Sequence, residues 1–281
     1  MGPQITQIKA RIPLILLIAV MGSPLATRAQ CTGVRGDRVA VIAGGFIATT
    51  ATVIALRQGD WWGTPTRSFH FTSGGSASAG QDRLLHGAIA YHVADLSTHA
   101  WHWACAGRAA PWLGAATGFL IGLPKEIGDG LHEARGFAVD DMAFAAIGAL
   151  LPALHATTPA TRIATLKGNW WPSAEFRNRP SGGLPRLETD YAGQRYFLSL
   201  VPGRVRPWGP VPWLGIALGH STASWALTPP VAEWYVTLDV EPGLLPLSGD
   251  VWEVIAWLGA RIKLPLPGLR ISVGTVEVGL Y

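Results

Sequence analysis

Charged residues are scarce in this sequence, since Asp, Glu, Lys and Arg together make up 14% of its 281 residues. The Lys and Arg side chains are scattered singly, and the net charge is only +4. The chain therefore lacks the basic patches with which proteins follow a phosphate backbone. We expect no nucleic-acid partner.

Cysteine is almost absent, with Cys31 and Cys105 as the two in the chain. An oxidising compartment would allow this pair to form a disulfide. Free cysteine is also a common small apolar side chain in protein interiors. We expect two unrelated buried side chains rather than a bridge.

Histidine is absent after His220, and this absence bears on one catalytic motif. The segment LGHSTAS places Ser221 between Gly219 and Ala223, which resembles the nucleophile elbow of a hydrolase. In that fold the catalytic histidine follows the serine along the chain. The sequence therefore argues against a serine hydrolase.

The beginning of the chain has the layout of a secretory signal peptide over residues 1–29. Two basic residues precede an apolar run from Ile12 to Met21, and small residues follow at the cleavage spacing, ending at Ala29. This layout predicts export to a bacterial cell envelope. Cys31 could suggest lipidation, but Arg28 and Gln30 stand where a lipoprotein signal has small or aliphatic residues, so we expect none.

The next two segments differ sharply in composition. Residues 30–58 contain an uncharged stretch from Val39 to Leu56 between Arg38 and Arg57, which makes them a candidate membrane span. Residues 59–80 are rich in Ser and Gly and predict a loosely ordered linker.

The rest of the chain divides into a helical domain, residues 81–157, and an aromatic-rich domain, residues 158–281. The first contains three apolar segments with short connections, Leu84 to Ala106, Ala110 to Pro124 and Ala138 to Leu154, which predict packed antiparallel helices. The second contains eight of the 13 tryptophans and short alternating segments that predict strands, with one helix near residues 249–260. The expected fold is α+β: a bundle of three to four membrane-associated helices, followed by the strand-rich domain.

Two features of the helical segments concern how they pack. Gly114, Gly118 and Gly122 recur every four residues and form a ridge that allows close approach of another helix. The first helix carries a polar stripe, formed by His92, Asp95, His99 and His102, for which we expect a solvated face rather than a metal site.

The segment KEIGDGLHEARGFAVDD, residues 125–141, holds seven acidic and basic residues in 17 positions, between two apolar runs. With the start of the first helix it supplies the candidate site residues Asp82, His86, Glu126, Asp129 and Asp141. Carboxylates and imidazole converging from several helix ends could bind a divalent metal ion or carry out acid–base chemistry. The alternative is a set of interfacial charges in which Lys125 and Arg83 pair with the acids.

These residues also carry a resemblance to a known family. The segments SFHF, QDRLLH, KEIGDG and RGF, together with the aspartate of VDDMAFAAIG, resemble the YfiM-like lipoprotein family, a bacterial family of unknown function, in its longer form with a C-terminal extension. The matching residues are Asp82, His86, Glu126, Asp129, Gly136, Phe137 and Asp141. Arg83 replaces the usual Lys and Ala145 a common Asn, which places any chemistry of those two residues in doubt. A looser resemblance is to VanZ-like membrane proteins.

The sequence leaves open whether the protein is an enzyme. The first hypothesis is a non-catalytic, exported cell-envelope membrane protein that contacts membrane lipid or an envelope protein partner. The alternative is a metal-assisted hydrolase or transferase that acts on a lipid-phosphate or cell-wall intermediate.

Overall fold

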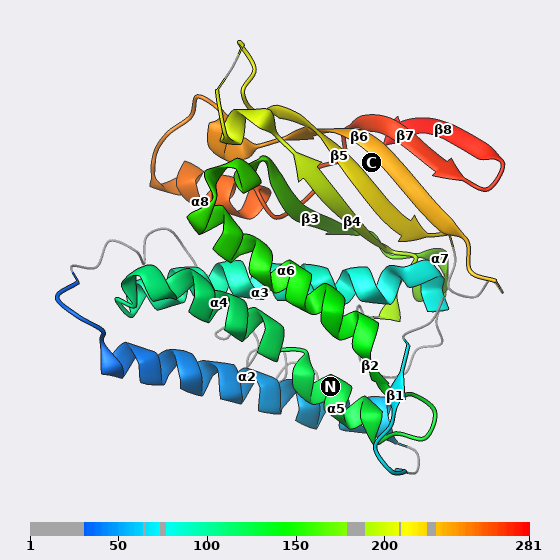
Figure 1. The fold of residues 1–281 in the computed structure, drawn as a ribbon. Coiled ribbons are helices and arrows are strands. Elements are labelled where there is room, and N and C mark those ends of the chain that lie inside the picture. Colours follow the sequence, from blue (N-terminus) through cyan, green and yellow to red (C-terminus); the bar gives the residue numbers. More distant parts are fainter. Residues whose placement is uncertain (1–30, 64–65, 74–76, 179–188, 208, 224–228) are drawn as a thin grey trace, which may run out of the picture.

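The computed structural model describes residues 31–281, except 64–65, 74–76, 179–188, 208 and 224–228. The predicted signal peptide, residues 1–29, lies outside the described residues. The chain forms a layer of helices and an antiparallel sheet above it (Figure 1). The predicted α+β class is therefore confirmed, with an apolar helix at the beginning of the described chain and a sheet at its end.

The helical layer is formed mainly by residues 36–157. Its helices are α2 (Gly36–Trp62), α3 (Gln81–Trp103), α4 (Ala110–Leu120), α5 (Leu123–Gly130) and α6 (Val139–Thr157). Short 3₁₀ turns, η2 (Ala77–Gly80) and η3 (Gly107–Ala109), precede α3 and α4. Helices α3, α4 and α6 pack on one another and form the core of this layer.

Small residues bring these three helices close together. A Cβ atom on Gly118 would lie 2.4 Å from the carbonyl oxygen of Ala90, and one on Gly148 would lie 2.0 Å from that of Gly87. Neither contact is sterically allowed, so glycine is required at both positions. The predicted glycine ridge of the second helix is thus confirmed as a packing surface.

Two of the described helices are long and apolar enough to cross a membrane, over Gly36–Gly59 and Val139–Thr157. The first is 6% buried, whereas the second packs on α3 and is 39% buried, as the core helix of a soluble protein also can be. These two helices do not show the expected bundle of three to four membrane helices. The candidate span of residues 30–58 corresponds to α2, which extends to Trp62.

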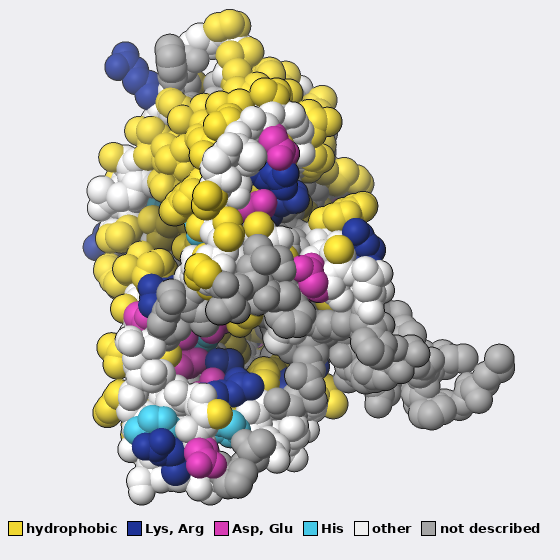
Figure 2. All heavy atoms as spheres, turned by 90° about the vertical axis from the view of Figure 1, so that its right-hand side faces the viewer, with side chains coloured by type: hydrophobic (Ala, Val, Ile, Leu, Met, Phe, Trp, Pro, Cys, Tyr) yellow, Lys and Arg dark blue, Asp and Glu magenta, His cyan; other side chains and the backbone are white. Residues whose placement is uncertain are grey.

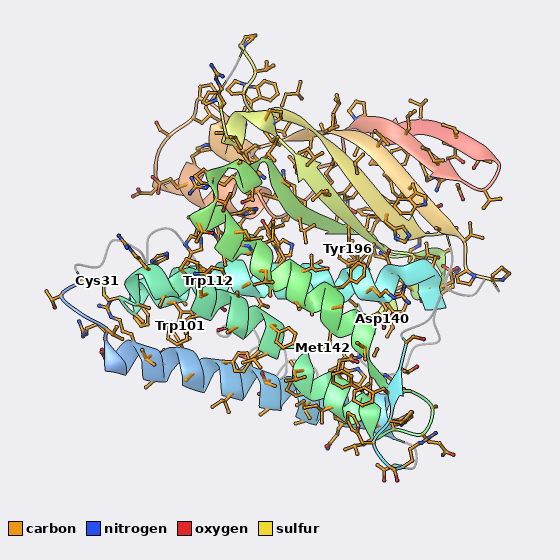
Figure 3. The ribbon with its side chains drawn as sticks, in the orientation of Figure 1. Cys31, Trp101, Trp112, Asp140, Met142 and Tyr196 are labelled. Atoms are coloured by element: carbon orange, nitrogen blue, oxygen red, sulfur yellow. A yellow bond between two sulfur atoms is a disulfide. The ribbon has the colours of Figure 1, made fainter. Side chains whose placement is uncertain are left out.

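Cys31 and Cys105 form a disulfide, so the expectation of two unrelated cysteines is wrong. The bridge joins the chain before α2 to the turn that follows α3 (Figure 3). The backbone N–H of Arg35 donates to the carbonyl of Ala104 at 3.0 Å, and the Arg38 guanidinium donates to the carbonyl of Trp103 at 2.6 Å. Because α2 lies alongside α3, the start of one helix meets the end of the other, which the spacing of the cysteines did not reveal.

The described parts of residues 59–80 contain more regular structure than the expected linker. They continue α2 to Trp62 and include strand β1 (Phe71–Thr72), which pairs in parallel with β2 (Phe137–Ala138). Phe69, Phe71 and Phe137 form a cluster of ring contacts beside this pair. This segment therefore folds onto the loop that leads into α6.

The sheet contains six strands in sequence order, all antiparallel. They are β3 (Ala164–Trp170), β4 (Gln194–Leu200), β5 (Leu214–Thr222), β6 (Ala232–Val240), β7 (Pro267–Ser272) and β8 (Thr275–Leu280). Helices α7 (Ala174–Arg177) and α8 (Asp250–Gly259) lie between strands, as do the 3₁₀ turns η6 (Pro202–Arg204) and η7 (Pro242–Leu244), while η4 (Pro159–Ile163) precedes β3. The predicted helix near residues 249–260 corresponds to α8.

Polar contacts join the helical layer to the sheet. The side-chain amide of Gln81 donates to the carbonyl of Gln194 at 2.9 Å, and its oxygen lies 2.8 Å from Nδ1 of His220. Asp95 pairs with Arg261, which follows α8.

The polar stripe of α3 is covered along much of its length rather than solvated as expected. His102 is exposed, but buried Nδ1 atoms of His92 and His99 have no hydrogen-bond partner within the described residues. Burial first, and then the Arg261 guanidinium, lowers the pKa of His92 to about 4. The stripe therefore lies at the junction of helices and sheet.

Candidate metal centre

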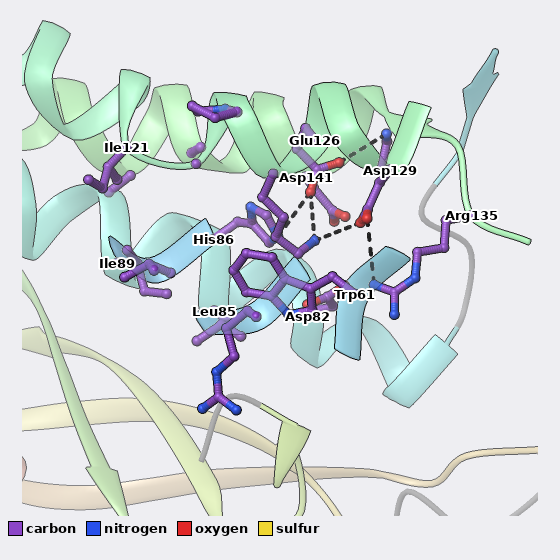
Figure 4. Close-up of a pocket in the computed structure, with 18 of the residues that line it drawn as sticks. Trp61, Asp82, Leu85, His86, Ile89, Ile121, Glu126, Asp129, Arg135 and Asp141 are labelled. Carbon is purple, nitrogen blue, oxygen red and sulfur yellow. Dashed lines mark hydrogen bonds and ion pairs between the residues drawn. The ribbon is translucent and has the colours of Figure 1, made fainter. Parts of the chain in front are cut away.

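A cavity of about 810 Å³ lies among α2, α3, α5 and the beginning of α6. One part of its wall is apolar and includes Val53, Ile54, Leu85, Ile89 and Ile121. The other part carries the predicted site residues Asp82, His86, Glu126, Asp129 and Asp141, so the structure brings all five to one cavity (Figure 4).

Three of these residues converge on one point. Asp82 and His86 stand four residues apart on α3 and therefore share a face of the helix. Asp141 belongs to the first turn of α6, where the helix dipole favours a negative charge. One donor atom from each residue lies within 4.8 Å of the other two, which is compatible with a single bound cation.

Among these three residues, Asp141 is the strongest candidate for a metal ligand. It is 4% exposed, and its Oδ1 has no hydrogen-bond partner among the residues that the structure describes. Burial, followed by the charges of Asp82, Glu126 and Asp140, raises the pKa of this carboxyl to about 7. A buried carboxylate oxygen without a donor is costly, and a cation would satisfy it.

His86 is in the state that a metal ligand requires. Burial, and secondly the Lys125 ammonium, lowers its pKa below the usual range. The ring is therefore neutral at physiological pH, when imidazole can coordinate a metal ion. Its Nε2 lies 3.5 Å from Oε1 of Glu126, which orients the ring within the cavity.

Glu126 and Asp129 are engaged in a separate network. The Lys125 ammonium lies 2.9 Å from a carboxylate oxygen of each, and Glu126 also accepts the backbone N–H of Ala138 at 3.2 Å. Asp129 accepts the indole N–H of Trp62 at 2.8 Å. Burial opposes the charge of Lys125, but the neighbouring carboxylates outweigh it and raise the lysine pKa.

This arrangement divides the predicted set of five into two groups. Asp82, His86 and Asp141 are positioned to hold a cation, whereas Glu126 and Asp129 hold Lys125 and the surrounding backbone. The donors of the first group, two carboxylates and one imidazole, suit manganese, zinc or magnesium and leave coordination positions for water or substrate.

The charges around the cavity also favour a cation. Its lining includes four carboxylates, from Asp82, Glu126, Asp129 and Asp141, and three cationic side chains, from Arg57, Lys125 and Arg135. When Asp141 is ionised, these charges leave one excess negative charge in the cavity. A divalent cation would offset this charge and favour the ionised form of Asp141.

Several participating residues have no recognisable signal in the sequence. Tyr191, which lies 109 residues after Asp82 and just before β4, donates its hydroxyl to Asp82 at 2.9 Å, and Trp62 of α2 donates to Asp129. Arg83, the departure from the YfiM-like pattern, lies outside the converging group and pairs with Asp140 at 2.6 Å. Long-range contacts of this kind depend on how α2 and the chain near β4 fold back onto α3.

The other catalytic motif does not form a site. Ser221 is buried within strand β5 and donates its hydroxyl to the carbonyl of Gln194 at 2.7 Å. A nucleophile elbow requires an exposed serine at a sharp turn between a strand and a helix. Ser221 therefore does not have the setting of a hydrolase nucleophile, as the sequence predicted.

No family model, curated protein or solved structure matches this chain. The resemblance to the YfiM-like family and the looser one to VanZ-like proteins remain predictions from the quoted motifs.

Proposed function

We propose that this protein is a divalent-cation-dependent hydrolase or transferase of the bacterial cell envelope, acting on an amphiphilic phosphate compound such as a lipid-phosphate. The observation that carries the proposal is the convergence of Asp82, His86 and the buried Oδ1 of Asp141, which has no hydrogen-bond partner among the described residues. Acidic residues at helix ends are common on protein surfaces, but here a buried donor atom points into a shared cavity.

Two groups of residues would bind the cation and the phosphate, respectively. Asp82, His86 and Asp141 would hold the cation, which supplies Lewis acidity and activates water when bound. Lys125 and Arg135 would bind and orient an anionic phosphate, because both lie on the same cavity wall. The pair of carboxylates that holds Lys125 fixes the position of its ammonium group.

The apolar wall favours an amphiphile over a free sugar phosphate. Val53 and Ile54 of α2 line the cavity together with Leu85 and Ile89 of α3. An acyl or isoprenoid chain could occupy this part while its phosphate lies near the polar end. Pockets that combine an apolar wall with a few convergent polar groups are typical ligand sites.

The first test is manganese binding by the full chain in detergent, measured by calorimetry. The wild type should bind one ion, and Asp141→Asn should weaken binding at least tenfold with an unchanged circular dichroism spectrum. Asp140→Asn is the matched control. Asp140 is the neighbour of Asp141 in sequence, but its carboxylate pairs with Arg83 outside the converging group. Equal binding by both variants, or none by the wild type, would refute the metal site.

The second candidate is the non-catalytic envelope protein that contacts lipid or a protein partner. It is favoured by the network of Lys125, Glu126 and Asp129, which satisfies these charges internally as a packing element would. This alternative predicts a wild type without metal and a lower melting temperature for Glu126→Gln. Screening phosphate release from lipid-phosphate substrates then separates a catalytic site from a metal that only stabilises the fold.

A further inference from the structure

The sheet has the reverse of the polarity expected in a water-soluble protein. In strand β6, the buried residues alternate strictly with exposed ones, but the exposed ones are Trp234, Val236 and Leu238. The buried ones on the opposite face include Glu233, Thr237 and Asp239. A soluble antiparallel sheet usually buries its apolar face and exposes its polar one.

The strand register extends this pattern across the whole sheet. One continuous row of paired residues crosses all six strands: Leu166, Leu198, Leu218, Val236, Leu269 and Val278. The adjacent row runs through Tyr196, His220, Trp234, Ile271 and Val276, and its exposed part begins at Trp234 because His220 is buried against Gln81 of α3. The row on the other side includes Ile216 and Leu238. None of the side chains in these rows, all within the described strands, carries a fixed charge.

The charges on the opposite face are paired with one another. Lys167 and Asp239 are almost fully buried and lie 2.8 Å apart, and Lys263 approaches the same carboxylate at 3.9 Å. Arg270 pairs with Glu233 at 3.3 Å. Burying these ion pairs has a desolvation cost, and exposing the aliphatic side chains to water has a further cost. This arrangement therefore indicates that the surroundings of the outer face are apolar.

We propose that the outward face of the sheet lies against the acyl chains of a lipid bilayer. With strands about 4.8 Å apart and a rise of about 3.4 Å per residue, six strands of six to nine residues make a face roughly 24 Å wide and 20–30 Å long. Such a face is at the upper end of the apolar patches that soluble monomers expose, or larger.

Two further observations favour lipid over a single protein partner. Exposed tryptophans, Trp170, Trp171 and Trp234, lie near one end of the strands, and Trp213 precedes β5 at the other, as in the aromatic belts at headgroup level. Exposed apolar residues also continue on the helical layer, for example Ile147 and Leu150 of α6. Figure 2, which views the molecule from one side, shows hydrophobic side chains over much of its upper part, where the sheet lies, with a few charged ones among them.

The test reconstitutes the full chain into phosphatidylcholine vesicles with or without bromine on the acyl-chain carbons nearest the headgroup, which quenches the emission of tryptophan rings at that depth on contact. Since α2 could hold the protein on a membrane by itself, the readout must be local. The contribution of Trp234 to the fluorescence is the difference in emission between the wild type and Trp234→Phe. Trp101, which donates to Thr117 between α3 and α4, gives the comparison through Trp101→Phe (Figure 3).

We expect bromination to reduce the contribution of Trp234 at least twofold, and by more than that of Trp101. An unchanged contribution of Trp234 would overturn the proposal. If, in addition, Leu218→Asp converts a dimer to a monomer in sedimentation measurements, the face is instead an interface between two copies of this chain.

Discussion

At the scale of single residues, the carboxyl group of Asp141 is the most informative feature. The i, i+4 spacing of Asp82 and His86 could be recognised in the sequence, and their common face was predictable. The sequence did not distinguish Asp141, whose Oδ1 has no donor in the described part of the chain, from Glu126, whose oxygens accept hydrogen bonds from Lys125 and Ala138. That distinction depends on the backbone N–H of Ala138 and on the orientation of Lys125, which only the folded loop defines.

The raised pKa of Asp141 predicts that manganese binding depends on pH. A cation binds the ionised carboxylate, and the pKa near 7 means that the proton must leave within the physiological range. His86 contributes less in this range than a free imidazole would, because burial lowers its pKa. We expect affinity to fall by up to about tenfold per pH unit below pH 7. Calorimetry between pH 6 and 8 measures this slope, and a constant affinity would contradict the assignment of Asp141 as a ligand.

At the scale of helices and strands, the sequence was informative where a periodic pattern existed. The glycine ridge at 114, 118 and 122, the helix near residues 249–260 and the alternating strands were all recognisable. The segment 59–80 was not, because Ser and Gly composition indicates a loop without showing that β1 pairs with β2. The exposed aliphatic face of the sheet was also missed, since alternation reveals two faces but not which one is buried.

Close packing of α3 and α6 predicts opposite effects for the same substitution at two glycines. In Gly148→Ala the new methyl group would meet the carbonyl of Gly87, and we expect a loss of about 1–3 kcal/mol in the free energy of unfolding. In Gly44→Ala, on α2, nothing lies within 4 Å of the new atom, and higher helix propensity should stabilise the chain by up to about 1 kcal/mol.

Denaturant unfolding in detergent, followed by circular dichroism, measures both variants. A stabilising Gly148→Ala would show that α3 and α6 are not in contact as described.

At the scale of the whole molecule, the junction between helices and sheet contains histidines held in their neutral form. His92 has a pKa near 4 in the fold, compared with 6.5 for a free side chain, because of its burial and Arg261. Between these values the unfolded chain binds a proton that the folded chain does not, so this stabilising contribution is present above pH 6.5 and is lost as pH falls toward 4.

We therefore expect a lower melting temperature at pH 5 than at pH 7.5, and a smaller difference in His92→Gln. His102→Gln is the matched control, because His102 lies on the same helix but is exposed. An equal change of melting temperature with pH in the wild type and in His92→Gln would show that His92 does not cause the pH dependence.

The bridge between Cys31 and Cys105 also restricts how the molecule can be oriented. Disulfides persist in oxidising compartments, and this one lies at the start of α2 and the end of α3. The cavity lies toward the opposite ends of both helices, lined by Arg57 and Asp82. If α2 crosses a cytoplasmic membrane, the bridged end must face the oxidising side, and the end of the helices that lines the cavity then lies toward the cytoplasm. The headgroup of its substrate would in that case be supplied from inside the cell.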